Sequence, residues 1–175
     1  MTESSTSSPT RPPEVTIRDL RWWDIESVHE IEVDLFHNDP WSVGQFWNEL
    51  AGVPQTRDFV VAERRVSGSP EDISKSGELL GYACLSSIGD TSDVQTIAVA
   101  RHVQGQGIGR LLLSLLIEKA SERGVDQVML DARAENSSAI ALYESVGFHT
   151  IHRRKAYYAP GVDAVVMQLD IKAES

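Results

Sequence analysis

A glycine-rich turn, Gln104-Gly105-Gln106-Gly107-Ile108-Gly109-Arg110, stands between an apolar run and an amphipathic segment. The run before it, residues 94–99, predicts a strand, and residues 107–123 place leucines at helical spacing. Glycine adopts the backbone conformations that such a tight turn needs. A strand, a glycine turn and a helix in succession expose several backbone N–H groups at a helix N-terminus, which favours an anion. This unit restricts the chain to folds that contain both strands and helices, and it predicts a phosphate site.

The spacing of the glycines decides between types of phosphate site. A dinucleotide fingerprint, G-x-G-x-x-G, is excluded because its third glycine position holds Arg110. The chain also contains no G-x-x-x-x-G-K-[ST] run of the Walker type. The pattern that fits is Q-x-x-G-x-G, formed by Gln104, Gly107 and Gly109. By itself this pattern leaves open a plain strand-to-helix turn with no ligand.

Hydrophobic periodicity along the chain predicts seven strands and four helices. The expected strands are residues 15–18, 58–63, 79–87, 93–100, 127–131, 148–158 and 162–169. The expected helices are residues 23–36, 42–50 with Ser42 as N-cap, 107–123 and 137–146. Residues 66–77 are polar and contain proline and glycine, which predicts a surface loop. The order predicts an α/β fold, with a mixed, largely antiparallel central sheet flanked by helices on both faces.

Length and composition predict one domain with a disordered N-terminal tail. The chain has 175 residues, of which 41% are hydrophobic, enough for a sizeable core. Residues 1–13 are rich in Ser, Thr and Pro and predict a flexible tail, which leaves residues 14–175 as the domain. No secretion signal and no apolar run of membrane-spanning length is found, and Cys84 is the single cysteine. We therefore expect a cytoplasmic protein.

The net charge of the chain is −10, which disfavours direct binding to nucleic acid. An acidic surface suits a basic protein or peptide partner, although acidity also serves solubility alone. No membrane partner is expected.

A second motif follows the predicted strand 127–131. It reads N-x-x-A-x-x-L-Y-x-x-x-G-F, from Asn136 through Tyr143 to Phe148. Together with the glycine turn, it resembles the GNAT superfamily of N-acetyltransferases, and the resemblance covers nearly all of the chain after residue 14. Further features resemble the RimI-like group, the ribosomal-protein-alanine N-acetyltransferases: Ile97-Ala98-Val99, Pro40-Trp41-Ser42, and Arg153-Arg154-Lys155-Ala156-Tyr157-Tyr158 followed by Asp163-Ala164 and Met167.

This resemblance implies an enzyme that transfers the acetyl group of acetyl-CoA to the N-terminal α-amine of a protein, with no metal. The implied acceptor is a small-subunit ribosomal protein with a basic N-terminal segment. Two alternatives stay open at this point. One is a GNAT enzyme that acetylates lysine side chains, other N-termini or a small amine. The other is an acyl-CoA-binding module with weak or no catalysis.

The reaction needs a base for the ammonium proton, an acid for the leaving thiolate and a donor for the oxyanion. The resemblance implies Asp131 as the base and Tyr143 as the acid. A backbone N–H in the strand before the turn is the expected oxyanion donor. The implied cofactor-binding residues are Ile97, Ala98, Val99, Gly105, Gln106, Gly107, Ile108, Gly109, Arg110 and Asn136.

At the base position the chain departs from the family pattern, which has glutamate where this chain has Asp131. Aspartate is shorter by one methylene, so its carboxylate is set back by about 1.5 Å. We expect either a water relay or a transfer of the role to another carboxylate, of which Glu135 is the nearest in sequence. A carboxylate that only caps nearby backbone is the alternative.

The peptide cleft is expected to involve Trp41, Tyr157 and Tyr158, aromatic residues in predicted loops or at strand ends. Such side chains stack on, or hydrogen-bond to, an extended peptide. The alternative is that they cover the edge of the core. His149 and His152 form an H-x-x-H pair, but in a strand this spacing puts them on opposite faces, which disfavours a metal site.

Overall fold

The computed structural model describes residues 15–64 and 77–171. A seven-stranded sheet contains β1 (Val15–Asp19), β2 (Arg57–Arg64), β3 (Glu78–Ile88), β4 (Thr91–Val99), β5 (Gln127–Arg133), β6 (His149–Ala159) and β7 (Val162–Asp170). The helices are α1 (Ile25–Leu35), α2 (Val43–Ala51), α3 (Ile108–Glu122) and α4 (Ser137–Glu144), with short 3-10 turns η1 (Trp22–Asp24) and η2 (Arg101–Val103). The element order predicted from the sequence is confirmed. The predicted tail, and the predicted loop apart from Gly77, lie outside the described residues.

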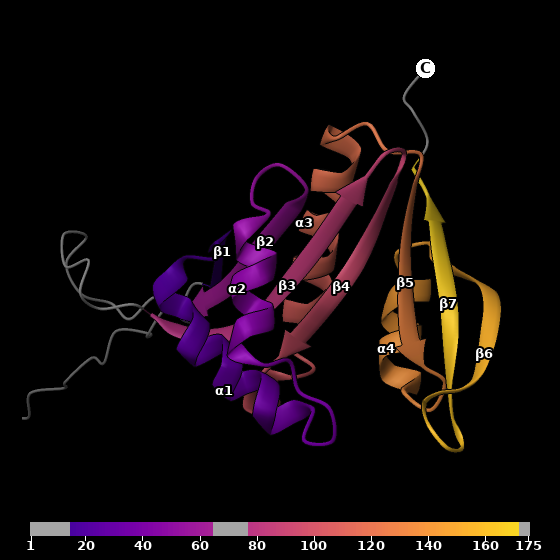
Figure 1. Cartoon of the computed structure of the whole chain (residues 1–175), viewed down its shortest axis with the longest axis horizontal. Coiled ribbons are helices and arrows are strands. Elements are labelled where there is room, and N and C mark those ends of the chain that lie inside the picture. The colour runs from indigo at the N-terminus through magenta and orange to yellow at the C-terminus, as the bar shows by residue number, and fades with distance from the viewer. Residues whose placement is uncertain (1–14, 65–76, 172–175) are drawn as a thin grey trace, which may run out of the picture.

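The strands are ordered β1-β2-β3-β4-β5-β7-β6, and every neighbouring pair is antiparallel except β4 and β5. This arrangement confirms the predicted mixed, largely antiparallel sheet. Figure 1 shows α1 and α2 in front of the β1–β4 half, with α3 behind it and α4 beside β5. None of the described helices is both long and apolar enough to cross a membrane.

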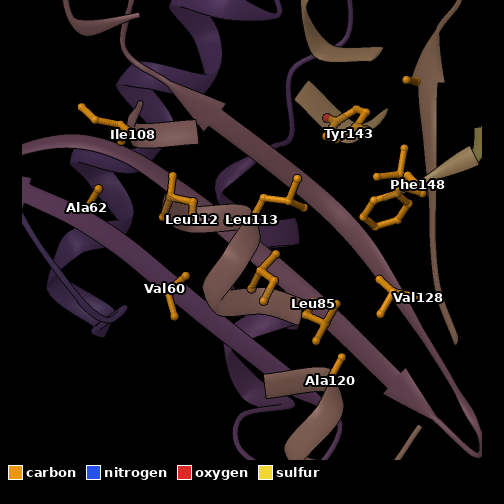
Figure 2. Close-up of a cluster of buried hydrophobic side chains, with 14 of the residues drawn as sticks. Val60, Ala62, Leu85, Ile108, Leu112, Leu113, Ala120, Val128, Tyr143 and Phe148 are labelled. Carbon is orange, nitrogen blue, oxygen red and sulfur yellow. The ribbon is translucent and has the colours of Figure 1, made fainter. Parts of the chain in front are cut away.

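Alternation along β2 divides the core between the two faces of the sheet. Phe59 and Val61 belong to the cluster that contains residues of α1 and α2. Val60 and Ala62 belong to the cluster formed with α3 and α4 (Figure 2). Since these four side chains are buried, the strand reads as a continuous apolar run and requires helices on both of its faces.

The parallel pair β4–β5 separates part-way along its length. The two strands pair only from Thr91 opposite Gln127 to Val94 opposite Leu130. At this point β4 also carries a bulge, because Cys84 of β3 pairs with Thr96 while Leu85 pairs with Val94. Beyond it the two strands diverge (Figure 1). The facing edges of β4 and β5 are therefore unpaired next to the glycine turn that starts α3 and the loop that starts α4.

Candidate active site

Gly105 and Gly107 give the turn before α3 its shape. Their φ angles are +77° and +85°, in the left-handed region that other residues adopt at a cost. A Cβ added to either residue would meet nothing within 4 Å, so the backbone conformation, not space, requires glycine there. Gly109 differs, because its added Cβ would lie 3.3 Å from Leu142 and 3.7 Å from Val99. This third glycine lets the start of α3 pack closely against α4 and the end of β4.

The turn presents a run of backbone donors without acceptors. Within the described ranges, the N–H groups of residues 105–110 have no hydrogen-bond acceptor. The first turn of a helix normally leaves such donors free, and the left-handed glycines add two more. Because the positive end of the α3 dipole lies at the same place, the turn fits an anionic group such as a pyrophosphate.

The side chains of the turn are largely occupied elsewhere. Arg110 donates from Nη2 to Ser145 Oγ at 2.7 Å, which ties α3 to the end of α4. Gln104 donates from Nε2 to the carbonyl of Val99 at 2.9 Å and so braces the end of β4 against the turn. Ile108 is buried in the core. These residues therefore offer an anion their backbone and not their side chains.

Asn136 is the N-cap of α4. Its Oδ1 accepts hydrogen bonds from the backbone N–H of Ala139 at 3.1 Å and from the hydroxyl of Ser138 at 3.0 Å. The side-chain nitrogen is not used in these bonds, so the cap leaves one donor at the start of α4.

The open edge of β4 contains Ile97, Ala98 and Val99. On one side these residues pair with β3, as Gly81 opposite Val99, Tyr82 opposite Ala98 and so on. Their other side faces the gap where β5 no longer pairs. An unpaired strand edge offers alternating N–H and C=O groups to an extended ligand. The edge leads directly from the divergence of the strands to the glycine turn.

A cavity of about 360 Å³ lies where β4 and β5 diverge. It unites Asp131 and the three aromatic residues predicted for the peptide cleft, and it draws residues from β4, β5, β6, β7 and the α1–α2 connection. Its lining consists of Trp41, Asp93, Val94, Gln95, Met129, Leu130, Asp131, Arg154, Tyr157, Tyr158 and Val166.

Asp131 carries an ion pair across this cavity. Its Oδ2 lies 3.2 Å from Nη1 of Arg154 on β6. Glu135, the predicted substitute carboxylate, does not line the cavity; its side chain is 67% exposed and lies 3.7 Å from Arg133. Of the two acidic residues considered from the sequence, only Asp131 lies at the site.

Tyr143 is a buried core residue on α4. Its ring packs in the core with Phe148, at a centroid separation of 6.1 Å (Figure 2), and it is not among the residues that line the cavity. Burial, and then the nearby Tyr158, raises the pKa of the Tyr143 hydroxyl to about 12. The hydroxyl is therefore protonated at neutral pH, as a proton donor must be.

Trp41 lines the cavity, and a buried carboxylate accepts a hydrogen bond from its backbone. Its ring packs against Phe46 at a centroid distance of 5.5 Å. Its backbone N–H donates to Oε1 of Glu32 at 2.8 Å, and the other oxygen of Glu32 accepts the hydroxyl of Tyr82. Trp41 therefore covers the edge of the core and also lines the cavity, and its contact with a peptide stays a prediction.

Tyr157 and Tyr158 on β6 also line the cavity, and their ring centroids lie 5.2 Å apart in an edge-to-face arrangement. Arginine side chains lie over both rings, Arg154 over Tyr157 at 5.0 Å and Arg133 over Tyr158 at 4.9 Å. The preceding Ala156 has a φ of +51°, and its N–H donates to Asp163 at 3.0 Å. This strained residue lies where β6 leaves its regular pairing and turns both rings to the cavity.

Known acetyltransferases resemble this chain in sequence and in fold. The acetyltransferase (GNAT) family model matches residues 19–148. The chain belongs to the GNAT family. It is 38% identical over 162 residues to N-alpha-acetyltransferase RimI of Mycobacterium tuberculosis, covering 89% of this chain and 92% of that one. It is 33% identical over 159 residues to the [ribosomal protein bS18]-alanine N-acetyltransferase of Escherichia coli K12, covering 89% and 97%.

Solved structures of acetyltransferases have the same fold as this chain. The crystal structure of the ribosomal-protein-S18-alanine N-acetyltransferase from E. coli superposes with a TM-score of 0.76 at 30% identity, over 93% of this chain and 97% of that one. The Salmonella typhimurium protein yncA, solved with its cofactor acetyl-CoA, shares the fold with a TM-score of 0.73 at 22% identity, over 93% and 96%. The chain is an acetyl-CoA-dependent acetyltransferase, and the resemblance found in its sequence is confirmed.

Two charged cavity residues of this GNAT chain were not predicted as site residues. Asp93 on β4 and Arg154 on β6 both line the cavity. Alternation along β4 gave no usable signal, because the bulge at Gln95 puts Asp93, opposite Ser86, and Ile97, opposite Ala83, on different faces of the sheet. Which strands lie beside β4 could not be read from the sequence either. Among the described residues, no group of three or more His, Cys, Asp or Glu side chains could hold a metal ion.

Replacing Gly107 with alanine is expected to weaken acetyl-CoA binding in this GNAT enzyme. Alanine at a φ of +85° costs about 1–2 kcal/mol, so the turn relaxes and its N–H groups lose their common direction. We expect the KM for acetyl-CoA to rise about tenfold while the KM for the amine acceptor changes little. Initial-rate kinetics with each substrate varied in turn measures this. Gly161→Ala, in the β6–β7 turn at φ +82°, is the matched control and should leave the KM for acetyl-CoA unchanged.

Proposed function

We propose that this enzyme acetylates the N-terminal α-amine of a protein, and that its acceptor is ribosomal protein bS18. The observation that best supports this proposal is the cavity at the divergence of β4 and β5. It combines carboxylates with aromatic side chains from the α1–α2 connection and β6. Carboxylates suit a cationic amine, and aromatic walls suit an extended peptide. The relatives named as bS18-alanine N-acetyltransferases, which match over 89% of this chain, support the acceptor.

Charge favours a basic acceptor segment. The chain has a formal net charge of −10, which draws a basic N-terminal segment toward it over distances of about a Debye length. In this proposal the enzyme works in the cytoplasm, where ribosomal proteins are made, and it binds neither nucleic acid nor membrane directly.

Bound acetyl-CoA supplies an activated acetyl thioester. In this proposal the N–H groups of residues 105–110 bind its pyrophosphate, and the open β4 edge of Ile97, Ala98 and Val99 holds the chain that carries the thioester. Asn136 offers its side-chain nitrogen at the start of α4. Tyr143 donates a proton to the leaving sulfur, while a carboxylate in the cavity takes a proton from the amine. Trp41, Tyr157 and Tyr158 hold the first residues of the peptide.

The test is intact-mass analysis of a synthetic peptide that carries the N-terminal sequence of bS18, after incubation with the enzyme and acetyl-CoA. The matched peptide has the same sequence with a blocked N-terminus and an internal lysine. We expect one acetyl group on the free α-amine and none on the blocked peptide. Acetylation of lysine alone would refute the N-terminal acceptor and leave the acetyltransferase activity intact. Thioester hydrolysis at the background rate, with no transfer to either peptide, would favour an acyl-CoA-binding module.

A further inference from the structure

Two carboxylates, not one, share the candidate active site. Asp93 on β4 stands opposite Met129 on β5, so Asp131, two residues further along β5, lies on the same face of the sheet. Both aspartates line the cavity at the divergence of the strands. The remaining ionisable groups around this cavity are Arg154, Tyr157 and Tyr158, all on β6. Either carboxylate is therefore placed to meet an amine that enters the cavity.

The two carboxylates differ in their partners. Asp131 is held by Arg154, whose guanidinium lies 3.2 Å from its Oδ2. The Asp93 carboxylate accepts no hydrogen bond and joins no ion pair within the described part of the chain. Partial burial, and then the charge of Asp131, raises the pKa of Asp93 above its ordinary value. An amine approaching Asp131 must compete with the guanidinium, whereas Asp93 is free to accept a proton.

We propose that Asp93 is the general base of acetyl transfer and that Asp131, anchored by Arg154, is a positioning residue. The inference rests on the proposed function, because it requires a protonated amine as acceptor. Both carboxylates lie on one face of the sheet, and among the described residues a guanidinium pairs with Asp131 alone of the two. A base with a raised pKa also operates closer to neutral pH, which favours proton transfer.

Asp93, Tyr143 and solvent account for every proton that moves during acetyl transfer. Asp93 accepts one proton from the ammonium, directly or through one water. The amine nitrogen then bonds to the acetyl carbon, the carbon–sulfur bond breaks, and Tyr143 gives its proton to the sulfur. The second proton that the nitrogen loses returns to Tyr143, and Asp93 releases its own to solvent. Arg154 keeps Asp131 in place, and the Asp131 charge holds the incoming cation beside Asp93.

Kinetics of Asp93→Asn and Asp131→Asn, compared over pH 5–10 with the wild type, test this assignment. The assay uses acetyl-CoA and whichever of the two peptides the wild type acetylates, so a wrong acceptor and a wrong base give different results. We expect Asp93→Asn to lower kcat about 100-fold or more and to move the acid-side fall of kcat/KM toward the pKa of the free amine, about 7.7–8.0, because only the neutral amine then reacts. Asp131→Asn should lower kcat less than tenfold, raise the KM of the peptide and keep the acid-side fall.

Stability and rescue separate a catalytic role of Asp93 from a structural one. A raised folded-state pKa means that the folded chain binds the proton more tightly than the unfolded chain, so ionisation of Asp93 lowers stability as pH rises. Asp93→Asn should therefore melt at pH 7 no lower than the wild type, and Asp93→Glu should recover activity that asparagine does not. Asp170→Asn, at the far end of β7, is the neutral control. A 100-fold loss and a shifted acid-side fall in Asp131→Asn, with Asp93→Asn near the wild type, would overturn the proposal.

Discussion

Replacing Tyr143 with phenylalanine is expected to lower kcat by about 100- to 1,000-fold, the range of a lost general acid. The leaving thiolate then has no protein donor beside it. Burial already raises the pKa of this hydroxyl to about 12, so the wild-type tyrosine keeps its proton up to pH 10. Release of free thiol under saturating acetyl-CoA and peptide measures kcat directly. Because the defect lies in a chemical step, the dissociation constant of acetyl-CoA, measured by calorimetry, should change less than threefold.

Phenylalanine is a suitable replacement because it keeps the ring that packs with Phe148. Removing only the hydroxyl should change the free energy of unfolding by less than about 1 kcal/mol, which urea titration checks. Tyr157→Phe is the matched control, since its side chain is half exposed and the same atom is removed from a cavity wall. It should affect the KM of the peptide more than kcat. A Tyr143→Phe variant with kcat within threefold of the wild type would mean that sulfur is protonated by water.

The parts of the site that the sequence predicted depend on short contiguous segments. The glycine turn needs Gly105 and Gly107 at positive φ, and glycine is the residue that adopts such angles readily. The α4 motif likewise contains its own N-cap, Asn136, and a glycine just past its end, Gly147 at φ +104°. Since each of these features depends on neighbours in the chain, the sequence alone predicted where the helices start and end.

The features that were missed depend on pairing between distant segments. Asp93 joins Asp131 only because β4 and β5 pair in parallel over a few residues and then diverge at a bulge. A slip of one residue in this pairing would put the two side chains on opposite faces. Arg154 reaches Asp131 because β6 lies beyond β7 at the edge of the sheet. No local pattern determines such a register. The position of Asp93 beside Asp131, and the ion pair that Asp131 makes with Arg154, could therefore be found only in the structure.

Glu32 is another residue whose role depends on contacts between distant segments. Its replacement is expected to have the second large effect, on stability and on peptide binding. It lies in α1, where its position reads as the polar part of an amphipathic helix, yet its side chain is only 3% exposed. One of its oxygens accepts the backbone N–H of Trp41, and the other accepts the hydroxyl of Tyr82, 50 residues away on β3. Burial and the Glu32 charge together raise the pKa of Tyr82, so its hydroxyl stays a donor. The carboxylate thereby links the sheet to a wall of the active-site cavity.

Glu32→Ala is expected to lower the free energy of unfolding by about 3–5 kcal/mol and to raise the KM of the peptide about tenfold. The substitution removes two hydrogen bonds to a charged group, each contributing about 1.5–3 kcal/mol, and leaves the buried Tyr82 hydroxyl without its acceptor. It also frees the backbone of Trp41, which lines the cavity. Urea unfolding measures the first effect, and initial-rate kinetics measures the second, with the KM of acetyl-CoA expected to change less than twofold.

Two further variants separate the anchoring of Trp41 from the bond to Tyr82. Tyr82→Phe removes one donor and keeps the Trp41 bond, so it should lose about 1.5–3 kcal/mol of stability with a peptide KM near that of the wild type. Glu32→Gln has the shape of glutamate but one acceptor oxygen and one NH2 group, so it can accept from Trp41 and donate to the Tyr82 oxygen. It loses the charge of the acceptor and should fall between the wild type and alanine. If Tyr82→Phe raised the peptide KM as much as Glu32→Ala, general loosening of the core would explain the effect. A peptide KM that rises with loss of the Trp41 bond alone would instead mean that a buried carboxylate on α1 sets the position of the cavity wall.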